Sequence, residues 1–160
     1  MMEIKVGMAD MNVCSSPDSI ITLGLGSCVG VILYDPVSKH SGMVHVMLPD
    51  STVISNNSNV AKFADTGIEE LLKRVIALGA DRDKLIAKIA GGAQMFSLGG
   101  AKSAIKVGER NVEAVKKKLQ ELGIRLVAED TGGNCGRTVT FFPETGDYLI
   151  KTIGKEPVTI

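Results

Sequence analysis

A thiol and an imidazole lie on two neighbouring segments that could bring them together. Cys28 stands where a glycine-rich turn, Gly24 to Ser27, gives way to a strand-like run from Val29 to Tyr34. A thiol at such a turn can be partly exposed beside free backbone N–H groups, which suits a nucleophile. His45 lies in a second strand-like run, Met43 to Leu48. An imidazole close to a thiol can accept its proton, so the pair could attack a carbonyl carbon.

The two runs read as a β-hairpin, whose register decides whether these side chains share a face. If Pro36 to Lys39 form a four-residue loop, Gly30 pairs with His45. Cys28 then becomes a diagonal neighbour of His45 on the same face, with backbones roughly 7–8 Å apart. A two-residue loop would place His45 opposite Ile32, roughly 13 Å along the strand from Cys28, which is too far for proton transfer. We expect the four-residue loop.

A hydroxyl near the turn could orient the imidazole. Thr22 lies near the end of the β-rich run Ser19 to Leu23. Its oxygen could fix the tautomer and ring angle of His45, as the third member of a triad does. The commoner roles of these residue types are structural, because free cysteines are usually buried and a threonine or histidine in a strand is usually a packing residue. An imidazole among methionines and valines nevertheless needs a polar partner.

Four segments resemble the CheD family of chemoreceptor glutamine deamidases. They are TLGLGSCVGVILYDPVSKHSGMVHVMLPDS from Thr22 to Ser51, GGAQMF from Gly91 to Phe96, IKVGERN from Ile105 to Asn111, and DTGGNCGRTVTFFPETG from Asp130 to Gly146. The resemblance therefore extends over nearly the whole chain. It implies that Cys28 is the nucleophile, His45 the general base and Thr22 the orienting hydroxyl.

The resemblance also implies a protein-glutamine glutaminase, a cysteine amidohydrolase of chemotaxis signalling. Such an enzyme converts receptor glutamines to glutamate through a thioester and releases ammonia. We expect the backbone amides from Gly26 through Ser27 to Cys28 to hold the oxyanion, the Ser27 hydroxyl to cap the turn, and a His45 imidazolium to favour the Cys28 thiolate. The implied substrates are methyl-accepting chemotaxis receptors, and a CheC-type phosphatase is an implied partner.

Composition excludes several other classes. The 160 residues are 44% hydrophobic and carry 18 basic and 18 acidic side chains, so the net charge is zero. We expect one domain over residues 1–160, with no basic stripe for nucleic acid. No apolar run approaches the roughly 20 residues that cross a bilayer, and no signal-peptide core is present, so we expect no membrane insertion. Three cysteines argue against a disulfide framework and for the cytoplasm.

The remaining cysteines and glycine motifs do not predict a metal site or a dinucleotide site. Cys14 and Cys135 belong to no Cys-x-x-Cys pair, so we expect no metal and no other cofactor. Gly24-x-Gly26 leads into a strand rather than a helix, which excludes the dinucleotide fingerprint. Arg137 either ties its glycine-rich loop down or contacts substrate, and we expect the structural role. The small-residue stretch from Ser97 to Lys106 reads as a loop of the active site or of a partner surface.

Periodicity predicts a strand-rich chain with two main helices. One helix, capped by Ser58 or Asn59, ends at Gly79, and the second begins near Glu109 to Asn111 and runs to Leu122. Its Lys116 to Lys118 run is expected to be a solvated face. Further strands are expected over Leu85 to Ala90, Ile124 to Glu129, Thr138 to Phe142 and Tyr148 to Ile153. The fold class is α/β, a single-domain α/β sandwich with a mixed, mainly antiparallel sheet.

Two other functions stay open on the sequence. The protein could be a regulatory binding module that docks on receptor helices or on a CheC-type phosphatase with little turnover. It could also be a hydrolase of small amides. Mass gain at receptor glutamines would exclude a binding module with little turnover. Ammonia release from free glutamine would indicate a hydrolase of small amides.

Overall fold

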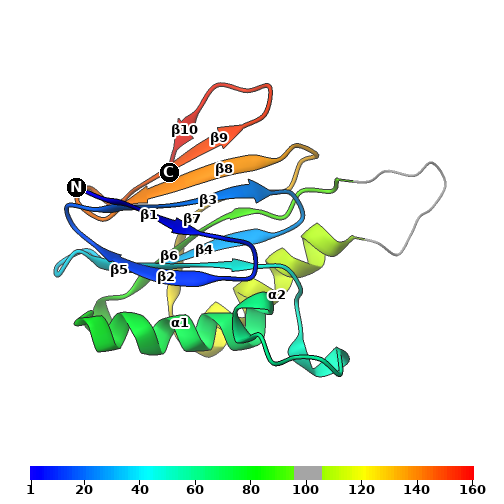
Figure 1. Cartoon of the computed structure of the whole chain (residues 1–160), viewed down its shortest axis with the longest axis horizontal. Coiled ribbons are helices and arrows are strands. Elements are labelled where there is room, and N and C mark those ends of the chain that lie inside the picture. Colours follow the sequence, from blue (N-terminus) through cyan, green and yellow to red (C-terminus); the bar gives the residue numbers. More distant parts are fainter. Residues whose placement is uncertain (96–105) are drawn as a thin grey trace.

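In a computed structural model that describes residues 1–95 and 106–160, two five-stranded sheets face each other and two helices cover the far side of one of them (Figure 1). We call the sheet that contacts the helices the helix-backed sheet. Its order is β2 (Met11–Ser15), β5 (His40–Val46), β4 (Val29–Asp35), β6 (Ile86–Gly91), β7 (Arg125–Thr131). The outer sheet has the order β1 (Glu3–Val6), β3 (Ser19–Leu25), β8 (Arg137–Phe142), β9 (Asp147–Thr152), β10 (Val158–Thr159).

Antiparallel pairing dominates both sheets. Each sheet has a single parallel pair among the described residues, β1 with β3 and β6 with β7. The predicted α/β class with mixed, mainly antiparallel strands and two main helices is confirmed. The division of the strands between two sheets is a feature that the sequence pattern did not reveal.

Strand β4 is buried on both faces because it lies in the middle layer. Val29, Val31 and Leu33 pack in the core beneath the helices. Ile32 and Tyr34, on the other face, pack against the outer sheet. The alternation of side chains along a strand therefore assigns each residue of β4 to one of two cores.

Helix α1 (Ala64–Leu78) buries Ile68, Leu71, Leu72 and Val75 and ends at Gly79, whose φ of 128° is a conformation that favours glycine. The predicted cap is wrong in one respect. The Asn59 side chain accepts from Ala61 N–H and caps a 3₁₀ turn, Val60–Lys62, whereas the buried Phe63 occupies the N-cap position of α1 itself. The chain therefore changes direction once more before the helix begins.

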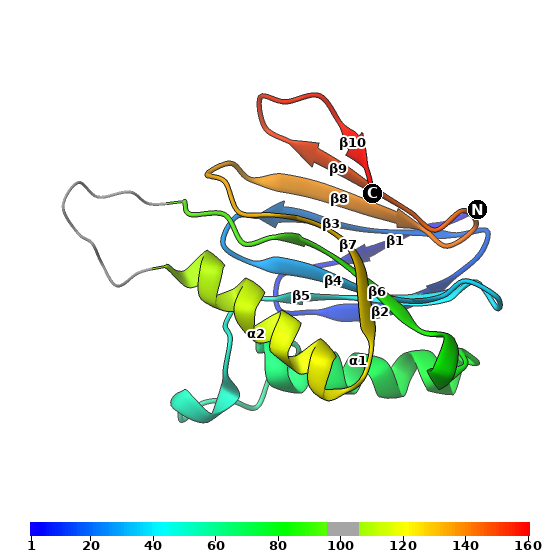
Figure 2. The same ribbon diagram turned by 180° about the vertical axis from the view of Figure 1, so that it is seen from behind.

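Helix α2 (Val107–Glu121) begins earlier than predicted. Its buried positions are Gly108, Asn111, Val115 and Leu119. The predicted solvated lysine face is confirmed for Lys116 and Lys117, which are exposed, whereas Lys118 is only partly exposed and pairs with Glu69 at 3.1 Å. Figure 2 shows α2 beneath the helix-backed sheet, where it contacts β4, β6 and β7.

Most predicted strands are present within two residues of their expected bounds. The strands β1, β2 and β10 were not predicted, and the predicted loop from Ser97 lies, up to residue 105, outside the described residues. No helix within the described ranges is both long enough and apolar enough to cross a bilayer.

Candidate active site

The β4–β5 hairpin has the register that a four-residue loop predicts. Asp35 pairs with His40 and Gly30 pairs with His45, and the ladder ends at Val29 paired with Val46. The Asp35 carboxylate holds the loop, because it accepts from Val37 N–H at 2.9 Å. The predicted register is therefore confirmed.

This register places Cys28 and His45 on the same face of the hairpin. Cys28 lies one residue before β4 and packs with Ile32 and Met43 in the core between the two sheets. His45 is two residues beyond Met43 on β5, so its side chain also faces the outer sheet. At Gly30, opposite His45, the space that a side chain would fill is taken by the Tyr148 hydroxyl, which would lie 2.8 Å from a Cβ and donates to the Gly30 carbonyl at 2.9 Å. The side chains of Cys28 and His45 therefore lie on the same side of the hairpin, between the two sheets.

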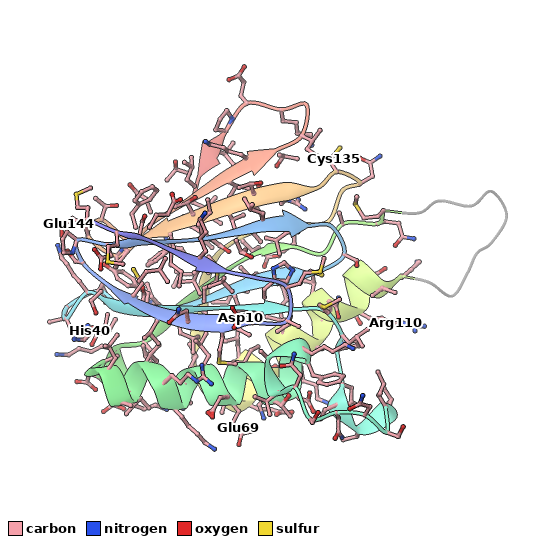
Figure 3. The ribbon with its side chains drawn as sticks, in the orientation of Figure 1. Asp10, His40, Glu69, Arg110, Cys135 and Glu144 are labelled. Atoms are coloured by element: carbon pink, nitrogen blue, oxygen red, sulfur yellow. The ribbon has the colours of Figure 1, made fainter. Side chains whose placement is uncertain are left out.

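The other histidine lies at the far end of this hairpin. His40 pairs with Asp35 at the last position of β4, whereas Cys28 precedes the first, so about 20 Å of strand separates them. Its Nδ1 is hydrogen-bonded to the Ser15 hydroxyl at 2.7 Å. Figure 3 shows His40 at the opposite end of the molecule from Cys135. His45 is therefore the only imidazole that can serve Cys28.

A chain of two hydrogen bonds fixes the tautomer of His45. Thr22 Oγ1 lies 2.7 Å from the Val6 carbonyl oxygen and 2.7 Å from His45 Nδ1. A carbonyl can only accept, so the Thr22 hydroxyl donates its single proton to Val6 and must accept from His45. The proton of the neutral imidazole is therefore on Nδ1. The structure brings the two sequence-predicted residues together as expected.

The second ring nitrogen of His45 is left with a lone pair and nothing to accept from. His45 is fully buried, and its Nε2 has no hydrogen-bond partner among the described residues. The backbone of His45 is held as well, because its carbonyl accepts from Ala9 N–H at 3.1 Å and its N–H donates to the Asp10 carbonyl at 3.0 Å. A rigidly held imidazole with a free acceptor nitrogen is suited to proton transfer.

The turn before Cys28 has all three of its carbonyls bound. Gly26 and Cys28 accept from Ala93 and Gly92 N–H, each at 2.8 Å, and Ser27 accepts from the Asn111 side chain at 2.9 Å. These bonds hold the carbonyl side of the turn in place.

Two amides of this turn face no carbonyl. The Gly26 N–H donates to Gly24 at 3.1 Å, whereas no carbonyl in the described part of the chain accepts from Ser27 or Cys28 N–H. The Cys28 N–H interacts with the Cys28 sulfur and so favours its thiolate. Two adjacent N–H groups to which no carbonyl of the described residues is bound, beside a thiol, can hold an oxyanion.

Burial sets the resting charges of the site. It raises the pKa of the Cys28 thiol above its ordinary value of 9.0, against the smaller effect of its own N–H. It lowers the pKa of His45 to about 4. At neutral pH the pair is therefore a thiol beside a neutral imidazole. The imidazolium that was expected to favour the thiolate is not present at rest.

Access to the site runs past the sulfur. Cys28 retains 7% of its surface exposed, whereas His45 retains none. A substrate carbonyl would therefore reach the thiol first and the imidazole behind it.

The other cysteines differ from Cys28. Cys14 is buried, and burial together with Asp18 raises its pKa to about 12, which leaves it unreactive. Cys135 lies in the loop after β7, where its thiol donates to the Asn134 side chain at 3.4 Å (Figure 3). Neither forms a disulfide with Cys28, since all three cysteines are free thiols.

Arg137 ties neighbouring loops together. Its guanidinium lies 3.2 Å from the Asp130 carboxylate and donates to the Gly91 carbonyl at 3.3 Å. These contacts are those of the predicted structural role.

Three supporting elements were missed by sequence reasoning. They are the Val6 carbonyl, the Gly91 to Ala93 segment and the Asn111 amide. Gly91 passes so close to the turn that a Cβ would lie 2.2 Å from the Cys28 carbonyl oxygen. Asn111 could have been found from its spacing, since it lies four residues before Val115 on the buried side of α2.

Comparison with known proteins gives a consistent result. A family described as CheD, chemotactic sensory transduction, matches residues 47–152. A protein of Lachnoclostridium phytofermentans named probable chemoreceptor glutamine deamidase CheD is 66% identical over 152 residues, which are 95% of this chain and 94% of the relative. A probable chemoreceptor glutamine deamidase CheD of Caldanaerobacter subterraneus is 56% identical over 94% of this chain and 93% of its own. The chemoreceptor glutamine deamidase CheD of Halalkalibacterium halodurans is 55% identical over the same shares of both chains.

Proposed function

The chain belongs to the CheD family, and from this premise we propose that Cys28, His45 and Thr22 form the triad with which it deamidates chemotaxis receptors. It converts glutamine side chains of these receptors to glutamate and releases ammonia. The observation that carries the triad is the imidazole of His45. One of its nitrogens is bound to Thr22, and the other, on the face that His45 shares with Cys28, has no hydrogen-bond partner within residues 1–95 and 106–160.

Acylation begins from the neutral pair. As Cys28 Sγ bonds to the side-chain carbonyl carbon of the glutamine, His45 Nε2 takes the thiol proton. The N–H groups of Ser27 and Cys28 hold the oxyanion. When the carbon–nitrogen bond breaks, Nε2 returns the proton to the leaving group, and ammonia departs. A thioester on Cys28 remains.

Deacylation uses the same groups in reverse. His45 Nε2 takes a proton from a water molecule, whose oxygen attacks the thioester carbonyl. The carbon–sulfur bond then breaks, and the sulfur recovers its proton from Nε2. The products are a glutamate side chain and the free enzyme. Throughout, the bond from Nδ1–H to Thr22 Oγ1 keeps the ring in place and stabilises the imidazolium while it exists.

The buried resting pair limits side reactions. Because burial disfavours both the thiolate and the imidazolium, charge separation waits until a substrate carbonyl can accept electron density. A thiol in this state is a poor target for adventitious oxidation or alkylation. We propose that acylation begins only once a receptor segment has bound over the opening of the site.

The partner and the location follow the family resemblance. We propose that a CheC-type phosphatase binds this protein and that both act in the cytoplasm. The three cysteines are free thiols, which agrees with a reducing compartment. Co-elution of the two purified proteins on size exclusion would test the partnership, and separate elution at micromolar concentration would contradict it.

The activity is tested with receptor cytoplasmic fragments and peptide mass spectrometry. The wild-type protein should replace an amide nitrogen by oxygen at specific glutamines and release ammonia in equal amount. Cys28→Ala should leave the fold intact and abolish both signals. Cys135→Ala is the matched control, since it removes a thiol that the mechanism does not use, and it should retain the wild-type rate.

The same assay separates the alternatives. Fragment binding without any mass change in the wild type would favour a binding module. Ammonia release from free glutamine without receptor modification would favour a small-amide hydrolase. Turnover that persists in Cys28→Ala would contradict the proposed triad.

A further inference from the structure

We infer that Asn111 is a positioning residue, whose side-chain amide holds the nucleophile's turn and the general base's strand at the separation that the reaction requires. The inference rests on the proposed function, because it concerns how Cys28 is presented to His45. Asn111 itself lies on α2, in the layer beneath the helix-backed sheet, and its hydrogen bonds go to the Ser27 and Met47 carbonyls rather than to the reacting side chains.

The first observation is a gap in the hairpin. The β4–β5 ladder stops at Val29 and Val46, one residue short of Cys28. Beyond it the second strand turns away, since the N–H groups of Met47 and Leu48 both donate to the Lys62 carbonyl. The two arms that carry the reacting residues therefore separate at the point where their spacing matters most.

The Asn111 amide closes this gap. Its Nδ2 donates to the Ser27 carbonyl at 2.9 Å and to the Met47 carbonyl at 2.9 Å. Ser27 immediately precedes Cys28, and Met47 lies two residues after His45. A primary amide has two N–H donors in one plane, so one side chain takes the place of the next rung of the ladder.

The second observation is the burial of this side chain. Asn111 is fully buried on a helix face whose neighbours one turn on, Val115 and Leu119, are apolar. Its Oδ1 is buried without a hydrogen-bond partner among the described residues. A core position that needed only packing would be filled better by an apolar side chain, so the two donors account for the amide.

The third observation is that α2 is seated against the same turn. A Cβ at Gly108 would lie 2.4 Å from the Ala93 carbonyl oxygen, so the first turn of α2 lies directly on the segment that binds Gly26 and Cys28. The helix therefore presents Asn111 from a fixed support. Loss of the amide would release Ser27 and Met47 from each other while the helix stays in place.

The test uses two variants. Asn111→Leu replaces the amide by an apolar side chain of similar size and removes both donors, and Asn111→Asp keeps the shape and replaces the donors by acceptors. Val115→Ala is the matched control, because it loosens the same face of α2 without contact to the turn. Unfolding in urea shows whether each variant is folded and how much its free energy of unfolding has fallen. One folded Asn111 variant is enough for the comparison.

We expect kcat for receptor-fragment deamidation to fall about 10- to 100-fold in both Asn111 variants, because small misplacements of reacting groups cost rates of this order. KM should stay within about twofold, since a positioning residue does not touch the receptor. The rate at which iodoacetamide alkylates Cys28 should rise about threefold or more, with its pH profile moved toward lower pH, because the freed turn is more exposed. Val115→Ala should change stability but neither rate.

A drop in kcat of equal size in Val115→Ala at equal loss of stability would overturn the inference, as would an Asn111→Leu protein with wild-type kcat. If the wild type itself modifies no receptor glutamine, the proposed function fails. The alkylation profile then still decides the positioning role, because an unchanged Cys28 profile in the Asn111 variants would refute it.

Discussion

Acid should destabilise this fold through His45 by an amount that its burial sets. The pKa of His45 falls from an ordinary 6.5 to about 4 because the ring is buried. The unfolded chain therefore takes up a proton on this residue at a higher pH than the native protein does. The stabilising contribution is fully present above pH 6.5 and is lost as the pH falls from there through 4.

The magnitude follows from the gap between the two values. At about 1.4 kcal/mol for each pH unit, the difference between 6.5 and 4 is worth about 3 kcal/mol below pH 4. At pH 4.5 most of this, about 2.5 kcal/mol, should already be missing. That is a large share of the 5–15 kcal/mol that typically stabilises a domain.

The assay compares the wild type with His45→Asn in urea unfolding at pH 7.5 and pH 4.5. The asparagine amide can still donate to Thr22 Oγ1 but cannot titrate. Buried carboxylates such as Asp35, whose pKa is lowered by its backbone hydrogen bonds, also lose stabilisation in acid, but they do so in both proteins. The wild type should lose about 2.5 kcal/mol more than the variant between the two pH values. If the wild type and His45→Asn lost the same free energy of unfolding between pH 7.5 and pH 4.5, the imidazole would not be buried in its neutral form.

Two further substitutions test the supports of the pair. Thr22→Val removes the hydroxyl between Val6 and His45 at nearly constant shape, and we expect kcat for ammonia release to fall about 10- to 100-fold. Thr22→Ser, which restores a hydroxyl, should recover most of the wild-type kcat. If Thr22→Val and Thr22→Ser had the same kcat, the orienting role would be contradicted. Gly91→Ala places a methyl group 2.2 Å from the Cys28 carbonyl oxygen at a φ of 117°. We expect the free energy of unfolding in urea to fall by more than about 3 kcal/mol and turnover to be lost. A variant as stable as the wild type would show that this close approach is not required.

Local geometry explains why the hairpin could be predicted. Its register depends on a short loop that the Asp35 carboxylate closes onto Val37 N–H, and both residues are visible in the sequence. Once the loop length was known, alternation placed Cys28 and His45 on the same face. The pairing with Thr22 was also within reach, because Thr22 is the strand hydroxyl that most closely precedes the turn.

Non-local contacts explain what the sequence did not reveal. The strand that supplies the Val6 carbonyl is four residues long and pairs in parallel with β3 at the edge of the outer sheet, a contact with no local signal. The buried face of α2 is set by the approach of Gly108 to the Ala93 backbone, which turned Asn111 inward and left Val112 only partly buried. The resting charges likewise depend on burial between two sheets, which periodicity cannot report.

The most direct test of Cys28 and His45 as one reactive unit is the intact mass of the enzyme quenched in acid during turnover of a receptor fragment. We predict a covalent adduct equal to the fragment less one ammonia, located on the Cys28 peptide, which forms in the wild type and does not accumulate in His45→Asn. Turnover at the wild-type rate without any adduct on Cys28, or adduct formation in His45→Asn as fast as in the wild type, would contradict the account.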